Sequence, residues 1–198
     1  LLTCSRTGTQ VIIDAAIEIN TVSEYLRSDP IAILITHGHK DHTAYLNEYI
    51  QQYPNINVLG HPDSHIRESN PHFKKVEDNQ GFIIGEMNFK GIHTPGHFFD
   101  SICYQLSPVL FTGDTIFIGR TGRIKGSRSN VEDLYRSVYD KILKMPKNMR
   151  IYPGHDYGDK PTMTLGENIK HSPLLRAKDL KDFQKRMVDY EKNRDVGS

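Results

Sequence analysis

The sequence has only two cysteines, almost no excess of either charge, and no hydrophobic run near the roughly 20 residues needed to cross a bilayer. Cys4 and Cys103 are far apart in the chain, which excludes a disulfide framework and predicts two reduced thiols in the core. A formal net charge of +1 argues against nucleic acid or a membrane as a partner. With 198 residues, of which 37% are hydrophobic and 25% charged, the chain is predicted to be a globular, cytoplasmic protein.

Histidine is plentiful by contrast, with ten copies, three of which follow one apolar run. Residues 31–35 (IAILI) are typical of a buried strand. His37 and His39 lie two positions apart, so an extended backbone points both side chains to the same face. Asp41 and His42 follow as the chain turns, and they can reach a second point nearby. Imidazole and carboxylate groups bind zinc, iron or manganese, and four ligands this dense favour two neighbouring metal ions over a solvated polar loop.

Short strands and helices are predicted on both sides of this motif. A chain that begins with a strand at Leu1, without a methionine, also suggests that further residues precede it. Thr21, with Glu24 three residues later, predicts a helix that starts with a capping box. Apolar residues at helical spacing predict another helix that ends before Pro54. The predicted elements are strands over 1–4 and 11–14 around a turn at Gly8, helices over 21–27 and 44–53, strands over 57–61 and 101–106, and a hairpin over 82–89.

Three further candidate ligands follow predicted turns or strands later in the chain. His97 comes after a Pro-Gly pair, which imposes a tight turn that can hold its ring rigidly. Asp114 comes just after the apolar strand 109–112, where a carboxylate suits a ligand that bridges two cations, although a Gly-Asp pair by itself is more often a turn. His155 follows a strand over 149–152 and a glycine turn. The same order of strand, turn and ligand therefore recurs.

The other histidines near these motifs are predicted to stay outside the ligand set. His93 is expected to support a ligand or to be structural, since orienting partners accompany metal ligands. His61, His65 and His72 lie in a polar segment without a partner at ligand spacing, so we expect them at the surface.

The second half of the chain contains a basic loop and several amphipathic helices. The loop over 119–126 is rich in glycine and basic residues, and two interpretations stay open. It is either an ordinary surface loop or a loop that recognises an anion beside the site, where arginine can bind a carboxylate through two hydrogen bonds. One apolar stripe predicts a helix over 130–144 that packs on a sheet. We predict a catalytic core over residues 1–160 and a helical C-terminal extension over 161–198.

The candidate ligands form two sets around one shared carboxylate. Strands that alternate with helices predict an α/β architecture with the ligands at strand ends on one edge. The first set is His37, His39 and His97, the second is Asp41, His42 and His155, and Asp114 bridges them. Two cations lower the pKa of a shared water towards neutrality, so a metal-bound hydroxide oriented by Asp41 and Asp114 is the predicted nucleophile. No serine or cysteine nucleophile is needed.

The motif over 36–42, followed by His97, Asp114 and His155 in that order, resembles the metallo-β-lactamase superfamily over nearly the whole chain. The resemblance implies a single-domain, four-layer αββα sandwich with a short helical C-terminal tail. It also implies that the dinuclear site lies at one edge of the sheets.

Within that superfamily, the segments 111–123 and 152–158 resemble the glyoxalase II group, the hydroxyacylglutathione hydrolases, which cleave glutathione thioesters. The resemblance places Arg123 near the basic contact that this group makes with its thiol substrate, and Tyr157 is a second candidate substrate contact. The implied activity is metal-dependent hydrolysis of a small-molecule thioester, with two divalent metal ions. Zinc is the first choice, and iron and manganese are the alternatives.

Three alternative functions are compatible with the same scaffold. Persulfide dioxygenases are oxidoreductases that hold one iron with residues matching His37, His97 and Asp114. They have Arg-Thr-Asp-Phe where this chain has Arg-Thr-Gly-Arg over 120–123, which favours the hydrolase. Hydrolysis of a lactone or another ester, and a metal-binding domain without catalysis, are the remaining hypotheses.

Overall fold

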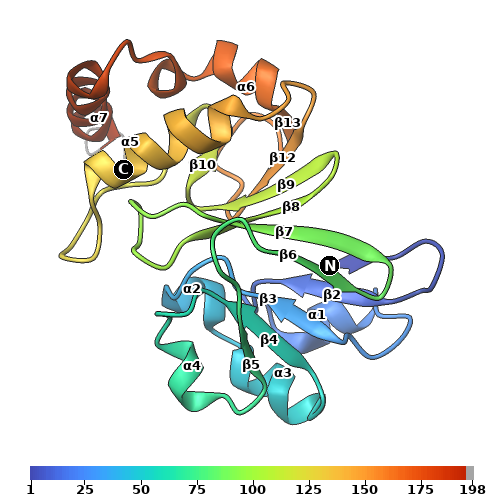
Figure 1. Cartoon of the computed structure of the whole chain (residues 1–198). Helices are drawn as coiled ribbons and strands as arrows, with labels where there is room; N and C mark the ends of the chain where they lie inside the picture. Colours follow the sequence, from blue (N-terminus) through green and yellow to red (C-terminus); the bar gives the residue numbers. More distant parts are fainter. Residues whose placement is uncertain (195–198) are drawn as a thin grey trace.

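Two β-sheets face each other at the centre of the molecule, and helices cover the outer side of each sheet (Figure 1). The computed structural model describes residues 1–194. The first sheet has the strand order β1-β2-β3-β4-β5 and the second has β13-β12-β9-β8-β7-β6, while β10 and β11 form a separate pair. The layers are therefore helices, sheet, sheet and helices, which confirms the predicted αββα sandwich.

The first sheet and its helices are built from the N-terminal part of the chain. Its strands are β1 (Leu2–Thr3), β2 (Gln10–Ile13), β3 (Ala32–Leu34), β4 (Asn57–Gly60) and β5 (Phe73–Lys75). The helices are α1 (Ile19–Ser23), α2 (Lys40–Thr43), α3 (Leu46–Gln52) and α4 (Ile66–Ser69). Strand β1 is antiparallel to β2, and β2, β3, β4 and β5 are parallel neighbours. The carboxyl ends of these parallel strands therefore lie at one edge of the sheet.

The second sheet and the remaining helices follow. The strands are β6 (Gly81–Ile84), β7 (Met87–His93), β8 (Ile102–Leu106), β9 (Val109–Gly113), β10 (Ile116–Phe117), β11 (Arg120–Thr121), β12 (Arg150–Pro153) and β13 (Met163–Thr164). The helices are α5 (Val131–Arg136), continued by a π turn η1 (Ser137–Lys141) and a 3-10 turn η2 (Ile142–Lys144), then α6 (Leu165–His171), η3 (Pro173–Arg176) and α7 (Leu180–Arg194). Strands β6 to β9 form an antiparallel meander, whereas β12 is parallel to β9.

Strand β3 shows why the sheets are covered on both sides. Ala32 and Leu34 lie in the cluster between the two sheets, whereas Ile33 and Ile35 lie in the cluster between the first sheet and α3. Successive side chains of a strand point to opposite faces, so a strand buried on both faces needs an uninterrupted apolar run. Each large aliphatic side chain buried in this way stabilises the fold by about 1.5–3 kcal/mol. The apolar run therefore fixes the strand that carries the first ligands.

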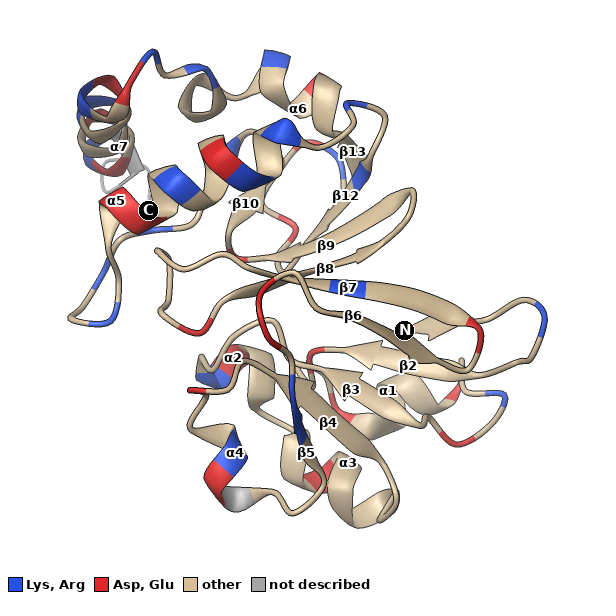
Figure 2. Cartoon of the chain, in the orientation of Figure 1, with Lys and Arg blue, Asp and Glu red and all other residues tan. Residues whose placement is uncertain are grey.

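The third cluster lies between the second sheet and the C-terminal helices, where Leu134 and Phe183 are fully buried. Leu174, Leu175 and Met187 join it, as the amphipathic pattern of the tail predicts. Lys, Arg, Asp and Glu lie mostly on the helices and loops, and the central strands carry few of them (Figure 2). The structure describes the predicted C-terminal extension as far as residue 194; residues 195–198 lie outside the described residues.

Two helix predictions are wrong in detail. The helix predicted over 21–27 is α1, which starts at Ile19, so Thr21 lies inside it and Glu24 follows its last residue. The backbone N–H of Thr21 donates to the carbonyl of Glu18, and no capping box forms there. The helix predicted over 44–53 is the shorter α3, which follows the separate turn α2. A capping box does occur, between Thr164 and Glu167 at the start of α6.

Both cysteines are free thiols. Cys103 is buried as predicted, whereas Cys4 is only partly buried, so the expectation of a core position is wrong for Cys4. Among the helices within residues 1–194, none combines the length and apolarity required to cross a membrane.

Candidate metal centre

The predicted ligands meet where parallel strands of both sheets end. Thr36 and His37 follow β3, Asp114 follows β9, and His155 follows β12. Two backbone hydrogen bonds hold these ends: the N–H of Ile102, the first residue of β8, donates to Thr36 O at 2.7 Å, and the N–H of Gly154 donates to Gly113 O at 2.9 Å. The loops that carry the ligands are therefore fixed by the sheets themselves.

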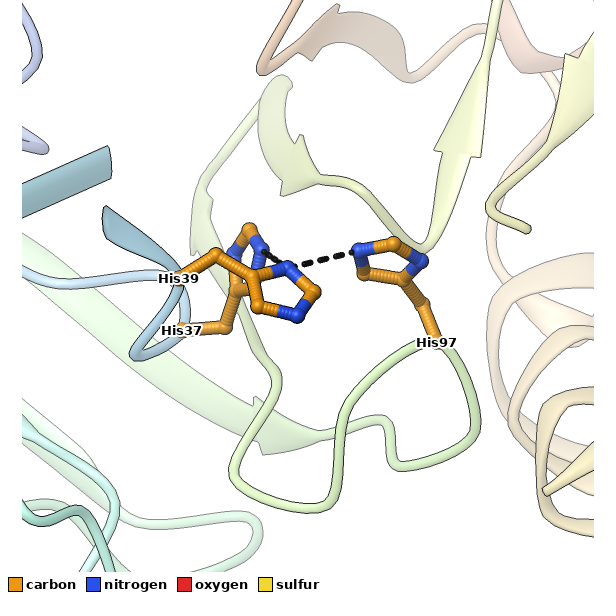
Figure 3. A group of neighbouring side chains, drawn as sticks. All are labelled: His37, His39 and His97. Carbon is orange, nitrogen blue, oxygen red and sulfur yellow. Dashed lines mark hydrogen bonds between the residues drawn. The ribbon is translucent and has the colours of Figure 1, made fainter. Parts of the chain in front are cut away.

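The first group consists of three imidazoles, as Figure 3 shows. His37 and His39 come from the loop after β3, and His97 comes from the loop after β7. Nδ1 of His39 lies 2.8 Å from Nε2 of His37 and 3.1 Å from Nε2 of His97. The three nitrogens converge on one point between the rings.

The second group consists of Asp41, His42 and His155. The short helix α2 presents Asp41 and His42, whereas we expected them in a loop before a helix. Nε2 of His155 lies 3.2 Å from Nε2 of His42 and 3.2 Å from Oδ2 of Asp41. The Asp41 carboxylate is largely exposed, and His42 is buried.

The carboxylate of Asp114 lies between the two groups. Its Oδ1 is 3.2 Å from Nε2 of His42, and its Oδ2 is 3.5 Å from Nε2 of His97 and 3.6 Å from Nε2 of His155. One buried side chain thus faces ligands of both groups, the position that the sequence predicts for a bridging residue.

The spacing of these atoms fits small divalent cations. A tetrahedral zinc site with bonds of 2.0–2.1 Å places its ligand atoms roughly 3.3 Å apart. Five separations between ligand atoms within the two groups run from 2.8 to 3.9 Å. Imidazole nitrogens and carboxylate oxygens are also the donors that zinc, iron and manganese accept. The residues present therefore fit two cations that share one carboxylate.

The protonation of the two groups differs. Burial, together with the charges of the surrounding histidines, holds the pKa of His37 well below its usual value, and burial also lowers the pKa of His39. Burial alone would lower the pKa of His42 too, but its contacts with Asp114 and Asp14 raise it to about 10. Burial opposes the ionisation of Asp114, yet the contact with His42 and the nearby histidines keep its pKa below the usual value. A cation binds neutral imidazole, so the second group must release a proton before it is loaded near neutral pH.

Asp14 supports this centre and was not predicted. Its Oδ2 accepts a hydrogen bond from Nδ1 of His42 at 2.7 Å, which leaves Nε2 of His42 facing the second group. Asp14 also accepts from the backbone N–H and the hydroxyl of Thr36, each at 2.7 Å. The available signal was its position directly after the apolar strand β2, the same placement that Asp114 has after β9.

Arg123 and Tyr157, the predicted substrate contacts, both line the cavity over the ligands, which has a volume of about 220 Å³. The carbonyl of Arg123 accepts a hydrogen bond from Nδ1 of His97 at 2.9 Å, so its backbone also orients a candidate ligand. The guanidinium of Arg123 lies 3.8 Å from the carboxylate of Glu191 on α7. The basic loop therefore lies beside the site, as one of its two interpretations predicts.

The remaining histidines divide into structural and exposed residues. Nε2 of His93 donates to the carbonyl of Phe99 at 2.8 Å, which confirms the structural alternative for His93. The ring of His61 stacks on His93 at 4.0 Å, so only 11% of its side chain is exposed and its predicted surface position is wrong. His65 and His72 are exposed as expected.

A second unpredicted carboxylate supports the loop between His37 and His39. Oδ1 of Asp100 accepts a hydrogen bond from the N–H of Gly38 at 3.1 Å. Asp100 is buried, and burial raises its pKa. The sequence alone did not distinguish it from other acidic loop residues.

Two glycines are required by the close approach of the strand ends. Gly113 has a φ of +47°, and a Cβ there would lie 2.7 Å from the side chain of Thr36. A Cβ on Gly154 would lie 2.6 Å from both Oδ1 of Asp114 and Cε1 of His42. Any larger residue at position 154 would therefore displace Asp114 or His42 and disturb the second group.

Comparison with known proteins gives a consistent result. The family model described as the metallo-β-lactamase superfamily matches residues 4–155. A probable polyketide biosynthesis zinc-dependent hydrolase, BaeB of Bacillus velezensis, is 32% identical over an alignment of 184 residues that covers 87% of this chain and 79% of the relative. A hydroxyacylglutathione hydrolase of Francisella tularensis subsp. novicida is 28% identical and covers 83% of this chain and 77% of the relative. The crystal structure of ETHE1 from Myxococcus xanthus has a TM-score of 0.82 and 27% identity, and the match covers 96% of this chain and 84% of that chain.

Proposed function

The chain belongs to the metallo-β-lactamase superfamily. We propose that it is a thioester hydrolase that binds two divalent cations, with zinc as the first choice of metal. One observation carries the proposal: the buried carboxylate of Asp114 faces ligands of two neighbouring groups at 3.2–3.6 Å. Two cations held by these residues would supply hydroxide at neutral pH and would polarise the carbonyl of the substrate. Relatives named as hydroxyacylglutathione hydrolase and as a zinc-dependent hydrolase support both the reaction class and the metal.

The protein's own residues would do the remaining work. Asp114 is buried and fixed between the groups, so its carboxylate keeps the ligands in register while it accepts hydrogen bonds from a nucleophilic water. Asp41 offers a second carboxylate, exposed at the cavity, that can orient the same water. Because both carboxylates are placed before the substrate arrives, little reorganisation is needed at the moment of reaction.

The wall of the cavity favours a substrate that carries negative charge. Arg123 lines this wall, and arginine binds carboxylates through paired hydrogen bonds. Tyr157 lines the same cavity with about half of its surface exposed, so it is available to contact the substrate. We therefore propose an anionic thioester of the hydroxyacylglutathione kind as the substrate.

The test combines elemental analysis of the purified protein with two assays. Hydrolysis of S-lactoylglutathione is followed by thiol release, and oxidation of glutathione persulfide is followed by oxygen uptake. We expect two zinc ions per chain and thioester cleavage. Asp41→Asn should abolish cleavage and leave the fold intact. Asp29 is an exposed acidic residue, so Asp29→Asn should leave both the cleavage rate and the fold unchanged.

Other outcomes would replace the proposal. One iron per chain with oxygen consumption would identify the persulfide dioxygenase instead. Two bound metal ions without activity on either compound would redirect the search to lactones and other esters. Metal binding without turnover of any of these substrates would leave a metal-binding domain.

A further inference from the structure

The candidate ligand histidines differ in what holds their rings. A metal-binding histidine is usually oriented by a hydrogen bond from its second ring nitrogen. Three of the five follow this rule: Nδ1 of His37 lies 3.2 Å from Thr36 Oγ1, Nδ1 of His42 lies 2.7 Å from Asp14, and Nδ1 of His97 lies 2.9 Å from Arg123 O.

His39 and His155 have no such partner within residues 1–194. His39 is enclosed by other rings, since Phe98 lies 4.2 Å away between centroids and two imidazoles adjoin it. His155 is at the rim of the cavity, where 28% of its side chain is exposed. No described protein group therefore orients the ring of His155 through a hydrogen bond to Nδ1.

A stack of flat groups lies against His155. The ring of Tyr157 is stacked on it, with centroids 4.9 Å apart and planes inclined by 22°. The guanidinium carbon of Arg120 lies 4.0 Å from the centroid of Tyr157, well within the range of a cation–π contact. Phe117 packs edge-on against Tyr157 at 5.2 Å and closes the side of the stack.

Arg120 is itself tied to the C-terminal helix. Its Nη1 donates a hydrogen bond to the hydroxyl of Tyr190 on α7 at 3.2 Å. The planar guanidinium can lie flat on a ring while its N–H groups donate in fixed directions, whereas a lysine ammonium is a point charge on a flexible chain. The side chain of Arg120 is partly buried between these groups, so it is not a free surface charge.

We propose that Arg120 is a positioning residue of the second ligand group: it holds Tyr157 against His155 and so replaces the missing hydrogen bond to His155 Nδ1. The inference rests on the two-cation centre put forward above. It also links α7 to that centre, because Tyr190 holds Arg120 in place. Arg120 contacts no candidate ligand atom, so it acts through the ring of Tyr157, with Phe117 as a second ring that adjoins both Arg120 and His155.

The test is a titration of the metal-free protein with Co²⁺, whose absorption spectrum distinguishes the two groups, together with competition by a chelating dye. Arg120→Ala should weaken the second binding event by about 10–100-fold, the usual effect of losing an orienting partner, and leave the first event unchanged. Arg120→Lys should behave like Arg120→Ala because it lacks the planar group. Tyr157→Phe should keep the wild-type affinity, whereas Tyr157→Ala should lose it.

The controls separate this inference from simple misfolding and from the proposed activity. Arg136→Ala, on the exposed side of α5, should change neither binding event. The first binding event reports the fold of every variant, and thermal unfolding checks it independently. Two cobalt ions in the wild type without thioester cleavage would refute the proposed activity and leave the role of Arg120 standing. An unchanged second affinity in Arg120→Ala, even with a raised KM, would overturn the positioning role, and a wild type that binds one cobalt ion would overturn it as well.

Discussion

The two ligand groups of the candidate centre are assembled from the same residue types, yet the protein holds them differently. The first group has three histidines, and two of them have lowered pKa values, so they are neutral near pH 7. The second group contains an exposed carboxylate, Asp41, a histidine with a pKa of about 10, His42, and the rim residue His155. The first group is thus ready for a cation, whereas the second must lose a proton and order its ligands.

This difference indicates where the protein can be tuned. Changes around the first group act on one buried and two partly buried side chains, which pack against one another. The second group depends on three separate supports, namely Asp14, the close approach of Gly154 and the stack on His155. We therefore expect the first group to bind its cation more tightly, and most single substitutions near the site to affect the second group alone.

The largest effect is expected from Asp114, because it faces both groups. Asp114→Asn keeps the size of the side chain but removes the charge that two cations would share. Bound metal should fall below two ions per chain, and hydrolysis should fall to background. Elemental analysis and the thioester assay measure both quantities, with Asp29→Asn as the matched control. Retention of two ions in Asp114→Asn would show that the two groups do not share this carboxylate.

Gly154→Ala should come next and should remove the second group selectively. The added Cβ would meet Oδ1 of Asp114 and Cε1 of His42 at 2.6 Å, so one of them must move. The Co²⁺ titration should lose its second event and keep the first. Gly81→Ala is the control, since a Cβ there meets nothing closer than 3.9 Å. Equal weakening of both events would mean that the substitution disturbs the whole edge of the sheets.

Asp14→Asn should have a smaller effect, again confined to the second group. The amide keeps the size of the carboxylate and can accept from the Thr36 N–H, but it no longer stabilises the proton on Nδ1 of His42. Weakening of the second binding event by about 10–100-fold is expected for the loss of such a partner. Isothermal titration with Zn²⁺ measures it. A change in the affinity of the first binding event alone would show that Asp14 supports the first group and would contradict this prediction.

The sequence was sufficient to single out the candidate ligands because they stand close to where an apolar strand or a tight turn ends. The run before His37, the strand before Asp114 and the glycine turn before His155 can all be recognised without any long-range information. The αββα layers followed from the same strands together with the family resemblance. The residues that meet at the candidate centre were thus predictable from local patterns.

Most supports of the candidate ligands were not predictable in this way, since they join residues far apart in the chain. Asp14 meets His42 across 28 positions, and Tyr190 meets Arg120 across 70. His61 looked like a surface residue until the sheets brought His93 over its ring. The capping box assigned to Thr21 failed for a similar reason, because packing starts α1 one turn earlier than the local signal does. Local patterns give the ligands, and tertiary contacts give their orientation.

The smallest effect, and the one that probes the first group, is expected from Asp100. Burial raises the pKa of Asp100, so the unfolded chain releases this proton more readily than the folded protein does. The contribution of Asp100 to the free energy of unfolding therefore falls as the pH rises above the usual carboxyl range. Asp100→Asn keeps an oxygen for the N–H of Gly38 and removes the buried charge, so its Tm should exceed that of the wild type at pH 8 and approach it at pH 4. Asp100→Ala, which also loses the acceptor, should loosen the loop between His37 and His39 and weaken the first Co²⁺ event. Thermal unfolding across this pH range decides the matter, because a constant difference in Tm between wild type and Asp100→Asn would contradict the raised pKa.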